Sequence, residues 1–221
     1  MNHLELIKHY KRDDFESALR SSIPVLNAEG NKIANLVPIG NWILAEKDII
    51  AAICEWREKN MDMFLIRFES SIQKTEKYLR DLSIGKPNRL LFMVYSDGKM
   101  VGHIGLSDVS QAEAELDNVM KGEITIKNLM YYSGIALFNV FFSMTEIENI
   151  SARVLSCNSR AISLYKKTGF HVYQDVPLSR HTDGDFTYHD FIVDKSKSNT
   201  PFSCYVMRLQ KSTFLKLIST G

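Results

Sequence analysis

Apolar residues recur along the chain with two different spacings, which predict a mixture of helices and strands. Spacings of three and four residues predict helices over 45–64, 70–82, 126–144 and 158–169. Short runs rich in β-branched and aromatic residues predict strands over 32–39, 89–95, 100–109, 112–120, 149–156, 170–176 and 202–209. The predicted order of elements is therefore β, α, α, β, β, β, α, β, α, β, β.

Turn signals connect some of these elements. Asp97-Gly98 lies between two apolar runs, and this pair favours a β-hairpin. The first thirty residues are less regular: 3–22 has the composition of a helix, and "NAEGN" at 27–31 indicates a turn that closes a hairpin. We find no internal repeat and no linker. We therefore expect one domain over 31–221, preceded by an N-terminal extension over 1–30.

Composition narrows the function classes. The chain is 45% hydrophobic, and its formal net charge of +1 predicts no long-range attraction to nucleic acid or to an anionic membrane. Cys54, Cys157 and Cys204 are far apart, which favours reduced thiols in a cytoplasmic protein over a disulfide framework or a zinc site. We expect neither a signal peptide at the charged N-terminus nor a membrane span in the broken apolar run 129–144.

The predicted helix over 158–169 has a candidate chemical role. Asn158 suits the N-cap position, and Gly169 suits the left-handed residue that ends a helix. Asn158 and Tyr165 are seven residues apart and project from the same side, close to where the preceding strand ends. There a tyrosine hydroxyl can give a proton to a leaving group, and an asparagine amide can bind the amide chain of pantetheine. The alternative is a capped amphipathic helix with a packing tyrosine.

Several segments resemble the GNAT acetyltransferase superfamily. "CNSRAISLYKKTGF" at 157–170 resembles its asparagine, alanine, tyrosine and glycine-phenylalanine signature. "CEWREKNMDMF", "KTEKYL" and "MVGHIGLSDV" are similar to segments of the branch that includes ribosomal-protein N-terminal acetyltransferases. The element order matches from about Lys32 to Leu209. The resemblance implies an α/β fold with a mixed, mostly antiparallel central sheet, flanked by helices and splayed between its fourth and fifth core strands. It also implies acetyl-CoA as co-substrate, direct attack by an amine, and Tyr165 as general acid. We expect no metal, for the reason given below for residues 180–190.

The chain departs from the superfamily at the pyrophosphate loop. The usual glycine-rich motif is replaced by "MKGEITIKNLMYYSG", in which Gly122 comes early and Gly134 lies inside the helix. A helix N-terminus can bind phosphate without that motif, because its free amides and positive dipole suit an anion. We therefore place the cradle around Thr125 to Met130, with Lys121 or Lys127 adding charge. The predicted cofactor-binding residues are Val119, Met120, Lys121, Thr125, Ile126, Lys127, Asn128, Leu129, Met130, Asn158 and Ala161.

Acetyl transfer to an amine needs an oxyanion donor and a group that takes a proton. A backbone amide near Val119 or Met120 is the predicted oxyanion donor. Strand alternation places Glu115, Asp117 and Val119 on one face, where two carboxylates would raise one another's pKa and help one accept a proton. The alternative is that both carboxylates face solvent. His103 is a second candidate base, although a lone histidine in a strand is more often packed or hydrogen-bonded.

Residues on two further segments are candidates for acceptor binding. Arg57 can bind a phosphate or carboxylate of the acceptor, with Phe64 nearby, although the spacing of both also fits a packed core. Residues 180–190 collect histidines and aspartates, but their loop spacing is not specific for a metal. The surrounding insertion, 177–201, is better suited to shaping the acceptor pocket or a dimer contact.

Three functions follow from this pattern. The leading hypothesis is an acetyl-CoA-dependent N-acetyltransferase acting on a primary amine of a small acceptor. An amino sugar, nucleotide-linked, is favoured because the series "WREKN", "KTEKYL", "LLFMVY", "GHIGL" resembles acetyltransferases of surface-polysaccharide pathways. The second is acetylation of a protein N-terminus, and the third is a non-catalytic CoA-binding module. We expect a monomer or a homodimer without nucleic-acid or membrane partners.

Overall fold

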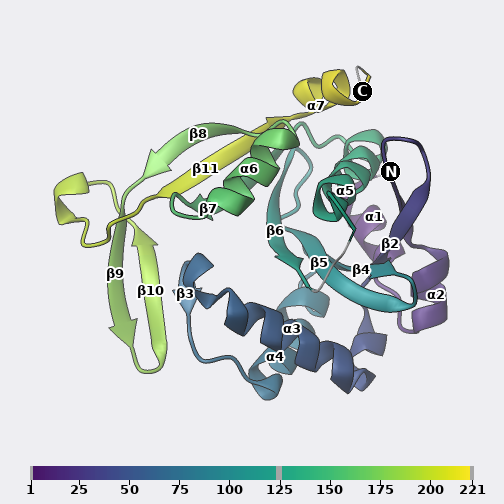
Figure 1. The fold of residues 1–221 in the computed structure, drawn as a ribbon, viewed down its shortest axis with the longest axis horizontal. Helices are drawn as coiled ribbons and strands as arrows, with labels where there is room; N and C mark the ends of the chain where they lie inside the picture. The colour runs from purple at the N-terminus through teal and green to yellow at the C-terminus, as the bar shows by residue number, and fades with distance from the viewer. Residues whose placement is uncertain (1, 123–125, 220–221) are drawn as a thin grey trace.

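Eight strands form the central sheet of the protein. The computed structural model describes residues 2–122 and 126–219. The strand order is β1-β2-β4-β5-β6-β7-β11-β8, and every neighbouring pair is antiparallel except β6 and β7, which are parallel (Figure 1). The strands are β1 (Ile23–Leu26), β2 (Lys32–Pro38), β4 (Leu90–Ser96), β5 (Lys99–Ser107), β6 (Glu113–Lys121), β7 (Asn149–Leu155), β8 (His171–Val176) and β11 (Cys204–Gln210). The predicted mixed, mostly antiparallel sheet is confirmed.

Helices cover both faces of the sheet. They are α1 (His3–Tyr10), α2 (Phe15–Arg20), α3 (Lys47–Lys59), α4 (Ile72–Tyr78), α5 (Leu129–Met144), α6 (Ser159–Lys167) and α7 (Lys211–Ser219). Short 3₁₀ turns occur at η1 (Asn41–Ala45), η2 (Met61–Met63) and η4 (Lys195–Lys197), and a π-helical turn, η3 (Leu79–Ile84), continues α4. The helices α1, α5, α6 and α7 pack on one face of the sheet, and α2, α3 and α4 on the other. We call these the first and the second face.

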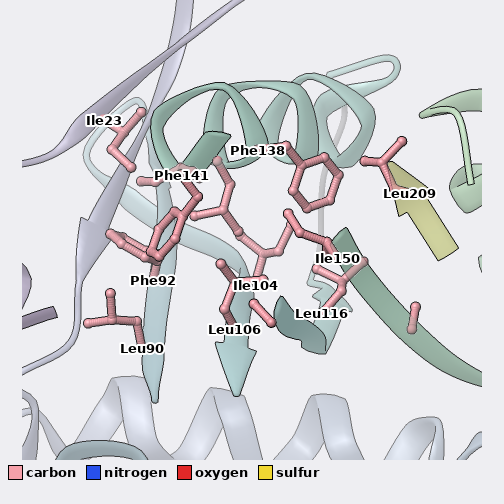
Figure 2. Packing of buried hydrophobic residues seen from close by; sticks show 14 of the residues in the cluster. Ile23, Leu90, Phe92, Ile104, Leu106, Leu116, Phe138, Phe141, Ile150 and Leu209 are labelled. Carbon is pink, nitrogen blue, oxygen red and sulfur yellow. The ribbon is translucent and has the colours of Figure 1, made fainter. Parts of the chain in front are cut away.

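The largest hydrophobic core lies under α5. This helix is apolar on nearly all sides because it is buried between the sheet and its neighbours. Figure 2 shows Phe138 and Phe141 pointing from α5 toward Ile104, Leu116 and Ile150 of three adjacent strands. Burying a phenylalanine side chain stabilises a fold by about 2–3 kcal/mol. This packing fixes the position of the N-terminal end of α5, which matters for the site described below.

The strands β6 and β7 separate along part of their length. Their pairing runs only from Glu113 opposite Asn149 to Leu116 opposite Ala152. Beyond that point β6 continues to Lys121 and β7 to Leu155 without pairing to each other. We call the space between 117–121 and 153–155 the slot. The predicted opening between the fourth and fifth core strands, counted from β2, is therefore confirmed.

A β-bulge in β6 changes which side chains share a face. The register with β5 passes from Gly105 opposite Asp117 directly to His103 opposite Met120. Because two residues of β6 oppose one of β5, the alternation of side chains shifts there. Val119 packs against the core of the first face, whereas Met120 belongs to the core of the second. The prediction that Val119 shares a face with Glu115 and Asp117 is therefore wrong.

The insertion between β8 and β11 forms two of the three strands of a second sheet. The strands of this sheet are β3 (Ile66–Arg67), β9 (Leu178–Asp183) and β10 (Phe186–Phe191), in the order β3-β10-β9. The hairpin of β9 and β10 extends away from the main sheet in Figure 1, while β10 pairs with β3 from the segment between α3 and α4. The sequence indicated only a polar insertion here. The hairpin thus links the second-face helices to the end of the main sheet.

The N-terminal residues are part of the same packed structure. The α1 residues Leu6, Ile7 and Tyr10 are buried in the main core, and β1 forms one edge of the sheet. The segment 3–22 forms two helices, because the side chain of Asp14 accepts a hydrogen bond from the amide of Ser17 and begins α2. The turn predicted at 27–31 does join β1 to β2. No helix in the described part of the chain has the length and apolar character to cross a membrane.

Candidate active site

The backbone of β6 presents the Val119 amide to the slot. The amide of Gly122 donates to the carbonyl of Val101 on β5. Amides alternate in direction along an antiparallel strand, so the Met120 amide points to β5 and the Val119 amide points away from it, toward the slot. Since β7 has separated from β6 there, no strand partner in register competes for the Val119 amide. Of the two predicted oxyanion donors, the geometry therefore favours Val119 over Met120.

The helix α6 carries Asn158 and Tyr165 to the first face beside the slot. The Asn158 side chain accepts a hydrogen bond from the Ala161 amide at 3.1 Å, so it caps α6 as the sequence predicts. Gly169, with φ of 96°, adopts the left-handed conformation after the helix end. Tyr165 is 8% exposed. Burial, together with the negative charge of Glu115, raises the pKa of Tyr165 well above its usual value, so its hydroxyl keeps its proton at neutral pH.

A pocket opens between the N-terminal end of α5 and α6. Its volume is about 260 Å³, and it is lined by Lys121, Ile126, Asn128, Leu129, Met130, Tyr131, Ser163, Leu164 and Lys167. Asn128, with φ of 60°, precedes α5, and its side chain accepts no hydrogen bond from the first turn of that helix. The first amides of α5 are thus left for an anion, and two lysine side chains line the same pocket.

Each candidate carboxylate on β6 has its own arginine partner. Oε1 of Glu115 lies 2.6 Å from Nε of Arg153 on β7, and Asp117 forms an ion pair with Arg89. The negative charges are compensated separately, which offsets the mutual repulsion that the sequence-based prediction assumed. Glu115 and Asp117 nevertheless remain on the second face, beside the slot, with partly exposed side chains.

His103 is buried beside the bulge. Its Nδ1 lies 2.6 Å from the carbonyl oxygen of Asn118, and because a carbonyl only accepts, Nδ1 carries the proton. The ring lies next to that of Trp56, with centroids 6.1 Å apart. Burial lowers the pKa of His103 to about 4, so the imidazole is neutral at pH 7. A group with that pKa takes up a proton weakly, which favours a structural role over a catalytic one.

Arg57 lies between two aromatic rings on the second face. Its guanidinium carbon is 4.2 Å from the ring centroid of Phe64 and 4.7 Å from that of Phe68. Nη2 donates to the carbonyl of Ile66 at 3.3 Å, while Nε is buried and has no hydrogen-bond partner among the described residues. Burial lowers the pKa of Arg57, and a buried cation with a free donor is suited to an anionic ligand.

Aromatic side chains of the β9–β10 hairpin lie next to Arg57 and its two aromatic neighbours. Phe186 contacts Phe68 with ring centroids 5.2 Å apart, and Lys74 lies over both rings. Phe186 stacks on Tyr188, which in turn stacks on His181 at 5.1 Å. We call Arg57, Phe64, Phe68, Lys74, Phe186, Tyr188 and His181 the aromatic–cationic cluster.

The histidines and aspartates of the insertion do not gather around one point. His181 pairs with Asp190 at 2.9 Å, and His189 bonds to the carbonyl of Leu65. In the part of the chain that the structure describes, no three histidine, cysteine or acidic side chains are arranged to hold a metal ion.

Comparison with known proteins identifies the family. The model of the acetyltransferase (GNAT) domain matches residues 43–185. The chain belongs to the GNAT acetyltransferase family. No curated protein sequence matches it significantly.

Several solved structures share this fold. RimL, a ribosomal L7/L12 alpha-N-protein acetyltransferase in complex with coenzyme A, has a TM-score of 0.65 and 11% identity, covering 86% of this chain and 98% of its own. FdhC, a nucleotide-linked sugar GNAT, has a TM-score of 0.57 and 14% identity over 85% of this chain and 92% of its own. The spermidine/spermine N-acetyltransferase SpeG of Vibrio cholerae has a TM-score of 0.58 and 16% identity over 84% and 98%. These acceptors differ, so the family fixes acetyl transfer without fixing the acceptor.

GNAT acetyltransferases use acetyl-CoA, and the pocket at α5 is where this chain can hold its phosphates. Of the predicted residues, Lys121, Ile126, Asn128, Leu129 and Met130 line it. Lys127 does not, Ala161 is part of the α6 cap, and Thr125 lies outside the described residues. The pocket also contains four residues that were not predicted: Tyr131, Ser163, Leu164 and Lys167. The spacing along α6 could have indicated Lys167, because residues three and four apart lie on the same side of a helix and Lys167 follows Leu164 and Ser163 by three and four residues.

Neither glycine near the cradle replaces the usual phosphate-binding glycines. A Cβ at Gly122 would lie 2.6 Å from Cε2 of Trp56, so this glycine lets α3 approach β6 closely. A Cβ at Gly134 would meet the ring of Phe138 at 3.4 Å, within the core. This GNAT domain therefore offers phosphate the end of α5 and lysine side chains rather than a glycine-rich loop.

Proposed function

We propose that the protein transfers an acetyl group from acetyl-CoA to the primary amine of a small anionic acceptor, and that the acceptor is a nucleotide-linked amino sugar. The observation that carries the choice of acceptor is the aromatic–cationic cluster. A nucleotide offers a phosphate for Arg57 and Lys74, and a flat base for the rings of the hairpin. A polyamine is cationic, and Arg57 would repel it.

We infer that the cluster presents the acceptor to the slot. The positive charge of Arg57 acts on both His103 and Tyr78, which lie next to the β6 bulge. The acceptor would therefore enter from the second face, where the carboxylates of Glu115 and Asp117 also lie. The pantetheine arm of acetyl-CoA would reach the slot from the pocket on the first face, past Tyr165.

The reaction follows from this arrangement as direct attack. The amine nitrogen attacks the thioester carbonyl, and the Val119 amide stabilises the oxyanion that forms. Tyr165, which keeps its proton, donates it to the departing CoA thiolate. Glu115 or Asp117 can bind the acceptor ammonium and take up its proton before or during attack. His103 is the weaker candidate base because of its low pKa.

The first experiment measures release of the CoA thiol with a panel of acceptors. Nucleotide-linked amino sugars are compared with the same amino sugars lacking the nucleotide, with polyamines, and with peptides that have a free N-terminus. The proposal expects turnover with the linked sugars and competitive inhibition by the matching nucleoside diphosphate. Turnover confined to peptides would instead establish a protein N-terminal acetyltransferase. Binding of CoA without turnover of any amine would favour the non-catalytic module.

The second experiment tests Arg57 directly. Arg57→Lys keeps the charge but loses the planar donors, so KM for the linked acceptor should rise about tenfold or more. KM for acetyl-CoA should stay within twofold, since Arg57 is on the opposite face from the CoA pocket. Arg20→Lys, at an exposed position on α2, is the matched control. An equal rise in both KM values would remove Arg57 from the acceptor site.

A further inference from the structure

Asn118 occupies an unusual backbone conformation at the edge of the slot. Its φ is 51°, in the left-handed region that is strained for most residues and that asparagine tolerates better than most. It is one of the two β6 residues that the β5 register passes over. The next residue is Val119, whose amide points to the slot. The direction of that amide therefore depends on the peptide plane that Asn118 sets.

Four hydrogen bonds hold Asn118 in this conformation. Its Nδ2 donates to the Tyr78 hydroxyl at 2.7 Å and to Oδ2 of Asp117 at 2.6 Å. Its backbone amide donates to Oδ1 of Asp117 at 2.8 Å, and its carbonyl accepts from Nδ1 of His103 at 2.6 Å. Backbone and side chain are thus both fixed, from three different residues.

The partners are themselves held in place. Asp117 is paired with Arg89, whose guanidinium also lies over the ring of Tyr78 at 5.6 Å. Burial raises the pKa of Tyr78, so its hydroxyl stays protonated and remains a neutral acceptor for the asparagine amide. These contacts join α4, the residue before β4, and β5 to two consecutive residues of β6. A bulge that only bends a strand does not require this many hydrogen bonds and ion pairs.

We propose that Asn118 is a positioning residue for acetyl transfer, which holds the Val119 amide in the direction needed to stabilise the oxyanion. The proposal rests on the acetyltransferase function proposed above. Glycine could adopt the same φ and keep the backbone bond to Oδ1 of Asp117, but it has no side-chain amide to donate to Tyr78 or to Oδ2 of Asp117, so the Val119 amide would sample several directions. Most other residues at position 118 would lose the same side-chain bonds and would also be strained at this φ.

A control at another residue distinguishes the effect of the left-handed backbone conformation from the effect of the hydrogen bonds to Asn118. Asp97, in the turn between β4 and β5, has φ of 49° and an exposed side chain. Replacing it by glycine changes a left-handed non-glycine residue to glycine without touching the slot. Asp97→Gly therefore serves as the matched control for the backbone effect alone.

The test uses acetyl-CoA labelled with ¹³C at the carbonyl, bound to the full-length protein. Difference infrared spectroscopy reports the polarisation of that carbonyl without requiring turnover. In the natural protein the band should lie lower than in free acetyl-CoA. In Asn118→Gly and Tyr78→Phe it should move back toward the free position, and kcat should fall about tenfold to a hundredfold with KM for acetyl-CoA little changed. Asp97→Gly should match the natural protein in both readouts.

Two results would overturn the proposal, and they have different consequences for the proposed function. If labelled acetyl-CoA binds with the same band in the natural protein and in both variants, Asn118 does not position the donor, while the acetyltransferase function stands. If the natural protein binds no acetyl-CoA, the proposed function fails and the role of Asn118 with it. Using two variants, one in β6 and one in α4, guards against a misfolded single variant.

Discussion

The Nε atom of Arg153 lies 2.6 Å from Oε1 of Glu115, and this ion pair joins β7 to β6 where their backbone pairing ends. Glu115 is opposite Ser151 in the register, and the last paired residues are Leu116 and Ala152. Arg153 is one residue past the last paired residue of β7, so the ion pair links the two strands just beyond the end of their backbone pairing. We interpret the pair as the closed end of the slot, which limits how far the two strands separate.

Breaking this ion pair should lower stability modestly. Glu115→Gln keeps the shape but removes the charge, and we expect the free energy of unfolding to fall by about 1 kcal/mol at low salt, less at high salt. Urea unfolding checks this. Glu55→Gln, from the exposed pair with Lys59 on α3, is the control and should change stability less. A double-mutant cycle with Arg153→Met that gave no coupling would show that the two side chains act independently.

Stability should depend on pH through His103. Its pKa is about 4 in the folded protein and about 6.5 when unfolded, so between these values the unfolded chain binds more protons. The free energy of unfolding should therefore rise with pH across that window, by about 3 kcal/mol. The measurement is urea unfolding at a series of pH values. His103→Gln should flatten this part of the curve, whereas the exposed His171→Gln should leave it unchanged. An unaltered slope in His103→Gln would show that other groups cause it.

The sequence predicted those parts of the fold whose signals are local. The β4–β5 hairpin and the capped helix α6 depend on neighbouring residues, namely Asp97-Gly98, Asn158 and Gly169, and all of them lie as predicted. The pairing of β10 with β3 could not be predicted in this way. It joins Tyr188 to Ile66 across more than a hundred residues, and β3 is only two residues long, too short for an alternating pattern.

The site could be predicted only in part for a related reason. The motif over 157–170 located α6 and Tyr165, but the arginine partners of Glu115 and Asp117 come from β7 and from the residue before β4, and they leave no spacing signal. The bulge at Asn118 was also invisible, because a single asparagine in a predicted strand does not show that the partner strand skips a residue. That bulge decides which side chains of β6 lie on each face beside the slot.

Gly122 should be intolerant of a side chain, whereas Gly134 should not. In Gly122→Ala the new methyl group would overlap the Trp56 ring, and relief of that overlap should cost about 1–3 kcal/mol of stability. In Gly134→Ala the methyl has ordinary space beside Phe138, and the higher helix propensity of alanine offsets the closer packing. Thermal unfolding of both variants tests the contrast. Equal melting temperatures would show that α3 can move away from β6 at little cost.

Tyr165→Phe should separate catalysis from cofactor binding. The variant keeps the buried ring against Phe170 but has no proton to give to the CoA thiolate. We expect kcat to fall about a hundredfold, with the Kd for acetyl-CoA within threefold of the natural value. Thiol release and calorimetry measure the two quantities. Tyr173→Phe, at an exposed position on β8, controls for loss of a hydroxyl elsewhere. Turnover at the natural rate would remove Tyr165 from the role of acid.

The lysines of the pocket at α5 should contribute to CoA binding through their charge. Lys121 and Lys167 line the pocket, and Nζ of Lys167 also lies 4.3 Å from the ring centroid of Tyr131, which restricts its position. Changing either lysine to methionine removes one positive charge near the phosphates. We expect the Kd for CoA to rise about tenfold at low salt, and the loss to shrink at high salt because screening weakens the attraction in the natural protein.

Neighbouring lysines supply the controls for this prediction. Lys166→Met lies next to Lys167 on α6 but outside the pocket lining, so it should change the Kd little. Lys127→Met tests the other residue that the sequence suggested for phosphate binding. Calorimetry of CoA and of pantetheine distinguishes a phosphate effect from a general one, because pantetheine has no phosphate to lose contact with. If Lys167→Met raises the Kd for CoA and the Kd for pantetheine by the same factor, the side chain supports the pocket wall, and the end of α5 binds the phosphates without it.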